Sequence, residues 1–152
     1  MNFEGRLLLQ APRERVFAAL NDVPFFASCI DGIGELSQLS GNQFTGLFET
    51  KLAYLRFKFD VTVEIVNVVP PARIEAKIEG APIGIVGRLV ATSITELLDR
   101  NGATEVHYKI DAALTGKLGS LGRPVLNAKA KQMEKQFTEN LNAAFAQDGA
   151  GS

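Results

Sequence analysis

The sequence predicts an α+β fold in which a seven-stranded antiparallel sheet wraps around one long C-terminal helix. Between residues 34 and 114, apolar and polar side chains alternate with period two, which is typical of an antiparallel sheet with one wet face. Within residues 118–146, apolar side chains recur at three- and four-residue steps, which is the period of an amphipathic helix. Because such a helix must bury its apolar stripe, the sheet is expected to cover it.

The chain is expected to begin with a strand and two short helices. Residues 2–10 read as the first strand. A helix follows Pro12, because proline suits the first turn of a helix, and it ends before Asp22. Asp22 is expected to cap a second short helix over residues 23–28, and residues 29–32 to form a turn.

Six further strands are predicted from the alternation and from the turn residues that interrupt it. They span residues 34–39, 43–51, 56–69, 73–79, 89–98 and 104–114. Successive strands joined by short turns form a meander.

The C-terminal helix is predicted to have one apolar stripe and one wet side. The stripe consists of Val125, Leu126, Met133, Phe137, Leu141, Ala144 and Phe145. The wet side consists of Lys129, Lys131, Glu134, Lys135, Glu139 and Asn142. Residues 1–147 are expected to form a single ligand-binding domain, and residues 148–152 a disordered tail.

The connections between strands are expected to gather at two chemically different ends of the sheet. Polar turns at residues 40–42, 70–71 and 99–102 share one end, and apolar, glycine-rich segments at residues 52–55, 80–87 and 116–122 share the other. The two short helices are expected at the apolar end. Surface connections are normally polar, so this end is interpreted either as a site (cavity mouth, partner surface or membrane-touching rim) or as loops that close the core.

Composition excludes several classes of function. The 152 residues carry a net charge of −1 with no basic block, which argues against nucleic-acid binding. Cys29 is the only cysteine, so no disulfide framework or metal-spaced pair is expected, and a reducing cytoplasm is the default compartment. No signal peptide or bilayer-spanning apolar run is recognisable.

No catalytic constellation is evident in the sequence. His107, the only histidine, falls on a polar strand face and is expected to be solvated, and Cys29 is expected to be a small buried hydrophobe. Carboxylates fall mostly on outward positions, with Asp31 and Glu49 as the two candidate exceptions. The sequence therefore predicts a binding module for an apolar ligand, with no metal and no cofactor.

Three segments carry a resemblance to a known family. APRERVFAALND at residues 11–22, CIDG at residues 29–32 and DAALTGKLGSLG at residues 111–122 resemble the family of the carbon monoxide dehydrogenase G subunit, CoxG, within the helix-grip superfamily of START-like and Bet v 1-like domains. The resemblance implies a helix-grip fold with a hydrophobic cavity. It also implies a non-catalytic accessory protein that serves a molybdenum hydroxylase, helps bring it to the membrane and binds quinone-like lipid.

Two features depart from the family pattern. Asp31 stands where many relatives have proline, which changes the stiffness and charge of that turn. Some relatives carry a C-terminal extension with a membrane anchor, whereas this sequence stops soon after its helix, so any membrane contact is expected to be transient and to use the apolar loops.

Together these observations predict a carrier of a lipid or quinone, associated with molybdenum hydroxylase subunits, cytoplasmic and peripheral to the inner membrane face. The predicted cavity residues are Phe57, Phe59, Val61, Tyr108, Leu118, Val125, Met133 and Phe137. The predicted gate residues are Tyr54, Ile83, Ile85 and Leu121. The Tyr108 hydroxyl is expected to bond either a ligand carbonyl or a partner within the protein.

Two other functions stay open on the sequence. The apolar end would be a protein interface if the chain were an assembly or docking factor without a ligand. A small helix-grip cyclase or hydrolase would need an ionisable group inside the cavity, which a buried Asp31 or Glu49 with a raised pKa would supply.

Overall fold

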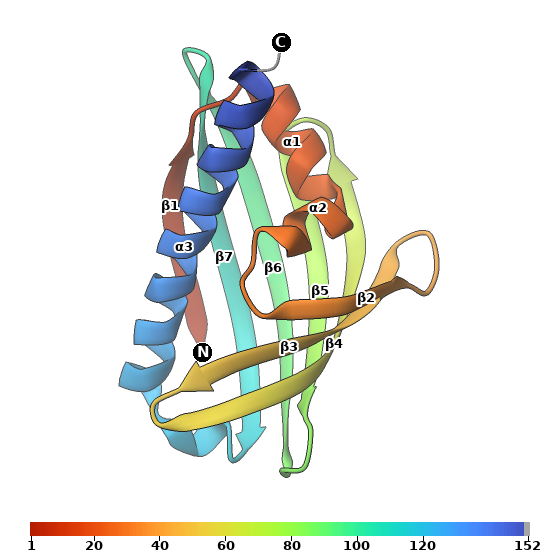
Figure 1. The fold of residues 1–152 in the computed structure, drawn as a ribbon, viewed down its shortest axis with the longest axis vertical. Coiled ribbons are helices and arrows are strands. Elements are labelled where there is room, and N and C mark those ends of the chain that lie inside the picture. The colour runs from red at the N-terminus through yellow and green to blue at the C-terminus, as the bar shows by residue number, and fades with distance from the viewer. Residues whose placement is uncertain (151–152) are drawn as a thin grey trace.

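The computed structural model describes the backbone of residues 1–150 and the side chains of residues 1–147. In this part of the chain, seven antiparallel strands form one sheet in the order β1-β7-β6-β5-β4-β3-β2, and a long helix crosses its concave side (Figure 1). The elements are β1 (Asn2–Leu9), α1 (Arg13–Asn21), α2 (Val23–Ser28), β2 (Ile33–Gln38), β3 (Gln43–Leu52), β4 (Leu55–Val69), β5 (Arg73–Pro82), β6 (Gly87–Arg100), β7 (Ala103–Gly116), the 3₁₀ turn η1 (Gly119–Leu121) and α3 (Arg123–Ala150). The predicted fold class is confirmed.

The strand boundaries differ from the prediction mainly at the β5–β6 hairpin. β5 continues to Pro82, which pairs with Phe59 of β4, and β6 begins at Gly87, which pairs with Gly116 of β7. The apolar segment 80–87 is therefore largely strand, because its neighbours on both sides satisfy its backbone hydrogen bonds.

The two short helices form as the sequence predicts. α1 buries Val16, Phe17 and Leu20 on one face. The Asp22 carboxylate accepts a hydrogen bond from the backbone N–H of Phe25 at 3.2 Å, which caps α2.

The predicted position of these helices is wrong. β1 pairs antiparallel with β7 so that Leu9 lies opposite Thr104, at the start of β7. The chain consequently leaves β1 beside the polar β6–β7 turn, and α1 packs at that end (Figure 1). The buried Thr104 hydroxyl fixes this arrangement by donating to the backbone oxygen of Ala11 at 2.8 Å.

The apolar core is divided into two clusters. The first cluster joins α1 to the sheet and to the C-terminal half of α3, and its buried members are Leu9, Ala11, Val16, Phe17, Leu20, Cys29, Ile74, Leu97, Val106, Leu141 and Phe145. The second cluster lies at the apolar-loop end, and its buried members are Leu52, Phe57, Phe59 and Leu118. Among the described side chains, residues 123–136 of α3 contribute to neither cluster.

Hydrogen bonds tie the C-terminal half of α3 to the rest of the molecule. The Asn142 amide accepts from the backbone N–H of Gln10 at 2.8 Å and donates to the backbone oxygen of Leu8 at 3.2 Å. Asn140 donates to the backbone oxygen of Cys29 at 2.9 Å, so it connects α3 with the end of α2. The long helix is therefore held firmly at one end.

Candidate functional site

Between the two clusters, the concave face of the sheet carries mostly small side chains. The strand register aligns them in two rows, which we call the concave strip: Val63, Ile78, Ala91 and Ala112 in one row, and Ile65, Ala76, Ser93 and Ile110 in the other. Alanine and serine along the middle strands leave room above the sheet that longer side chains would fill.

The larger side chains of the strip are incompletely covered. Val63, Ile78 and Ile110 are only half-buried, although they face the side of the sheet that α3 crosses. On α3 itself, Met133 is half-buried, and Leu126 is the one fully buried residue between positions 123 and 136. The N-terminal half of α3 thus covers the concave strip without packing tightly onto it.

A polar pair connects α3 with the sheet beside this strip. The Tyr108 hydroxyl on β7 donates a hydrogen bond to the Glu134 carboxylate on α3 at 2.7 Å. Burial, followed by the hydrogen bond to Glu134 and its negative charge, raises the pKa of Tyr108 well above its ordinary value. Of the two partners expected for this hydroxyl, the structure shows the one within the protein.

Gly5 of β1 makes room for this pair. It lies opposite Tyr108 in the sheet register. A Cβ at Gly5 would meet the Glu134 carboxylate and would lie 2.6 Å from the Tyr108 hydroxyl oxygen, closer than nonbonded atoms tolerate.

The prediction that Glu134 belongs to the wet side of the C-terminal helix is wrong. Glu134 is half-buried and bonded to the sheet. It completes an inner line with steps of three and four residues: Leu126, Ala130, Glu134, Phe137, Leu141 and Phe145. That spacing is the signal from which its inward position could have been found.

The structure distributes the predicted cavity residues over three places. Phe57, Phe59 and Leu118 are buried in the second cluster, and Val61 packs against it. Phe137 packs against the first cluster, with its ring centroid 4.9 Å from that of Phe26. The other three, which are half-buried and lie between the clusters, are Tyr108, Val125 and Met133.

The predicted gate residues all lie on the connections at the apolar end, shown at the bottom of Figure 1. Tyr54 and Ile83 are exposed, whereas Ile85 and Leu121 pack against the second cluster. The end is therefore partly closed core and partly exposed apolar surface.

The other candidate residues form no catalytic group. Asp31 and Glu49 are exposed, so neither places a buried carboxylate in the cavity. His107 is half-buried instead of fully solvated, because β1 and β6 flank it on the convex face, and its Nε2 lies 3.4 Å from the Glu105 carboxylate. Cys29 is buried, and burial raises its thiol pKa against a smaller lowering by Ser28.

Glu105 is held by its neighbours on the convex face. Burial alone would raise its pKa, but hydrogen bonds from His107 and Arg100, together with their charges, lower it. In the described part of the chain, no group of three or more His, Cys, Asp or Glu side chains is placed to hold a metal ion.

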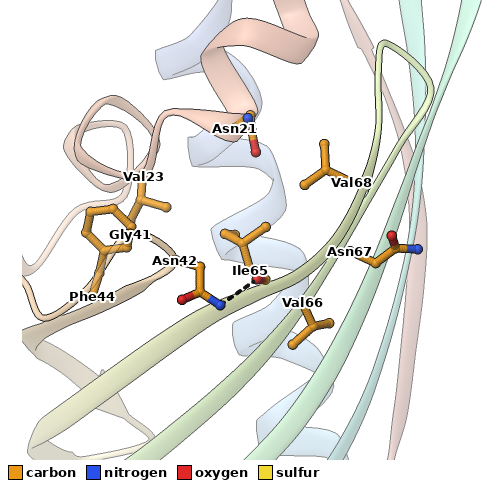
Figure 2. A pocket seen from close by; sticks show the side chains of 9 residues that line it. All are labelled: Asn21, Val23, Gly41, Asn42, Phe44, Ile65, Val66, Asn67 and Val68. Carbon is orange, nitrogen blue, oxygen red and sulfur yellow. Dashed lines mark hydrogen bonds between the residues drawn. The ribbon is translucent and has the colours of Figure 1, made fainter.

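A hollow that the sequence did not reveal lies at the rim of the sheet. It measures about 370 Å³ and is lined by Asn21, Val23, Gly41, Asn42, Phe44, Ile65, Val66, Asn67 and Val68 (Figure 2). Its origin is a register shift between Ile65 and Asn67, which turns Val66 outward. The lining carries no charged side chain, and Asn42 donates to the Ile65 backbone oxygen at 3.2 Å.

A second hollow of about 420 Å³ lies on the β1–β7 edge, where its lining consists of Arg6, Leu7, Leu8, Arg100 and Glu105. Neither hollow includes any of the predicted cavity residues.

The family model for CoxG, the G subunit of carbon monoxide dehydrogenase, matches residues 5–146 of the chain. The chain belongs to this family. Family membership indicates an accessory role associated with carbon monoxide dehydrogenase, and the resemblance seen in the sequence is thereby confirmed.

Solved structures share the fold of this CoxG family member. A conserved protein from Geobacillus kaustophilus is 22% identical with a TM-score of 0.88, covering 97% of this chain and 96% of its own. Protein Ms6760 from Mycobacterium smegmatis is 14% identical with a TM-score of 0.70, covering 97% and 92%. A protein from Rhizobium loti is 18% identical with a TM-score of 0.68, covering 94% and 95%. No curated protein matches the sequence.

Two features of the CoxG-like segments are clarified by the structure. The Asn140 amide lies 3.4 Å from the Asp31 carboxylate, so the aspartate that departs from the family pattern faces α3 at the turn after α2. Among the described helices, none is both long and apolar enough to cross a membrane.

Proposed function

We propose that this CoxG family member is a non-catalytic cytoplasmic protein that binds a hydrophobic ligand, a lipid or quinone, over the concave strip. In this role it would serve a molybdenum hydroxylase of the carbon monoxide dehydrogenase type and its recruitment to the inner membrane face. The observation that carries the proposal is the strip itself, which lies between two separate core clusters under a loosely packed half of α3.

The chemistry of the strip supports an apolar ligand. Sites for small molecules are mostly apolar, with few polar groups that fix the orientation of the ligand. Val63, Ile78 and Ile110 supply the apolar surface, and Tyr108 with Glu134 supplies a polar pair at its edge.

The position of the ionisable groups supports a binding role over a catalytic one. General acid–base catalysis needs a titratable group within hydrogen-bond reach of the reacting atom. Glu134 and Tyr108 are the ionisable residues that the described side chains place beside the strip, and they are bonded to each other.

The test is mass spectrometry of organic extracts from protein purified gently from its own host. Ser93 is half-buried on the concave strip, so Ser93→Phe should fill the space over the sheet. Thr92 is its exposed neighbour on the opposite face, and Thr92→Phe is the matched control. We expect a lipid or quinone in the wild-type and Thr92→Phe extracts and its loss from folded Ser93→Phe protein.

Absence of any lipid from folded wild-type protein would contradict the ligand part of the proposal. A ligand retained equally by both variants would place the binding site elsewhere, with the rim hollow of Figure 2 as the next location to test. Co-purification of hydroxylase subunits without a ligand would favour a docking factor.

A further inference from the structure

Positive charge is concentrated at the apolar-loop end of the molecule. Three segments meet there: residues 50–58 around the β3–β4 turn, residues 80–88 around the β5–β6 turn, and residues 113–124 after β7 (Figure 1). They contain no acidic residue, although the whole chain has a net charge of −1. Their basic residues are Lys51, Arg56, Lys58, Arg88, Lys117 and Arg123. We call these three segments the basic tip.

Most of this charge is uncompensated. Lys58 pairs with Glu49 at 3.5 Å and Arg88 with Glu79 at 3.0 Å. Among the described residues, no ion pair is found for Lys51, Arg56, Lys117 or Arg123, and all four are exposed.

Lys51 and Arg56 lie directly opposite each other in the β3–β4 register. Like charges at such positions destabilise a hairpin, so folding alone would favour opposite charges there. The pair therefore points to a role outside the fold.

The basic tip also carries large apolar side chains in full contact with solvent. Their exposed fractions are 94% for Tyr54, 52% for Leu55, 49% for Ile83 and 85% for Val86. They belong to two neighbouring hairpin tips, and the second of these is linked to the loop after β7 by the hydrogen bond from the Lys117 N–H to the Val86 oxygen at 3.1 Å.

We infer that the basic tip docks on an anionic lipid bilayer, with Tyr54 and Val86 entering the interface and the surrounding lysines and arginines contacting lipid headgroups. The inference rests on the membrane role in the proposed function and names the surface and the lipid chemistry for it. Tyrosine suits this position because its ring is apolar and its hydroxyl remains hydrated.

A bilayer fits the tip better than an acidic protein does. Protein interfaces have a closely packed apolar centre with complementary shape. The apolar side chains of the tip instead project from the ends of separate hairpins, with charge of one sign around them. A fluid surface that is negative outside and apolar inside accepts that arrangement without a matching shape.

Co-sedimentation of the full chain with vesicles tests the inference. Each basic residue held at an anionic surface strengthens partitioning about fivefold, and the attraction is screened by salt. We expect the protein to bind vesicles of phosphatidylcholine with phosphatidylglycerol, to bind pure phosphatidylcholine far more weakly, and to be released by high salt.

The variant Lys51→Glu separates membrane binding from folding. It replaces the like-charge pair with Arg56 by an opposite-charge pair, so its Tm should equal or exceed that of the wild type. Because one attraction is lost and one repulsion is added, partitioning into anionic vesicles should fall about 25-fold. Lys135→Glu, at an exposed position further along α3, changes the net charge equally and should leave partitioning within about twofold of wild type.

The apolar part of the tip is tested with Val86→Ser, at a side chain that is 85% exposed. Weaker vesicle binding at unchanged Tm is expected. Equal binding to anionic and neutral vesicles, or equal losses with Lys51→Glu and Lys135→Glu, would overturn the inference.

The same preparations distinguish this inference from the proposed function. A lipid or quinone in the extracts, together with no vesicle binding, would overturn the docking surface and leave the carrier role standing. Vesicle binding without an extracted ligand would do the reverse. Loss of hydroxylase co-purification in Lys51→Glu, without vesicle binding by the wild type, would assign the tip to a protein partner and overturn the inference.

Discussion

Gly5 is the residue whose missing side chain permits the contact between sheet and helix. A Cβ there would lie 2.6 Å from the Tyr108 hydroxyl oxygen and would also meet the Glu134 carboxylate. We expect Gly5→Ala to displace that hydrogen bond and to lower the free energy of unfolding by about 1–3 kcal/mol, the usual cost of overpacking. Urea denaturation monitored by circular dichroism measures the change.

Gly34 provides the control for this substitution. A Cβ at Gly34 meets no atom within 4 Å, so Gly34→Ala should be neutral within about 0.5 kcal/mol. Equal effects of the two substitutions would show that the contact over Gly5 does not contribute to stability.

The raised pKa of Tyr108 has a consequence at alkaline pH. Because the pKa is higher in the folded protein than the ordinary value of about 10, the stability that Tyr108 contributes is complete below that pH. It is lost as the pH rises from that value through the folded-state pKa. With Tyr54→Phe, Tyr108 is the only tyrosine, and ultraviolet titration reports its ionisation alone.

Glu134→Gln in the Tyr54→Phe background tests the cause of this shift. Burial, the largest cause, persists in this variant, but the negative charge of Glu134 is removed. The tyrosine pKa should therefore fall while staying above its ordinary value. An unchanged titration curve would show that Glu134 has no influence on the phenol.

At the scale of single residues, facing in the strands was predictable and the exceptions on the helix were not. In β7, Val106 and Tyr108 point inward as expected, because a strand has only two faces. Glu134 was misassigned because polarity was given more weight than spacing. Its side chain is held inward by Tyr108, a partner from a strand distant in the sequence.

At the scale of elements, α3 has two differently held halves. Its C-terminal half buries Leu141 and Phe145 and is bonded through Asn140 and Asn142, whereas residues 123–136 belong to neither core cluster. Segments with few buried contacts open at lower free energy. Hydrogen exchange with mass spectrometry should therefore show faster exchange in residues 123–136 than in residues 137–147.

Uniform protection along α3 would contradict this expectation. The variant Asn142→Ala supplies an internal comparison, because it removes the bonds to Leu8 and Gln10. It should accelerate exchange in the C-terminal half and reduce the difference between the two halves.

The elements themselves were largely predictable, but the position of α1 and α2 was not. Turn residues and periodicity defined every strand, and Pro12 and Asp22 marked the helix starts. The end at which the helices pack depends on β1 pairing with β7, a contact between the two extremes of the sheet. Local patterns carry no information about that pairing.

At the scale of the whole molecule, the division of the core was also beyond the sequence. The eight predicted cavity residues share an inward face, yet Phe57, Phe59 and Leu118 close the second cluster and Phe137 packs on the first. Alternation identifies which side chains face inward. Where the curved sheet meets α3, and where it stands clear of the helix, depends on twist and on the anchoring of α3 at one end.

The division predicts that substitutions in the two clusters act independently. Leu97→Ala in the first cluster should cost about 2–5 kcal/mol of unfolding free energy. Combined with Phe57→Leu in the second cluster, its effect should add within about 0.5 kcal/mol, because the clusters share no buried member. Combined with Phe145→Leu in its own cluster, it should deviate from additivity by about 0.5–3 kcal/mol. If both pairs couple equally in urea denaturation, the core is continuous, and the concave strip offers no space for a ligand.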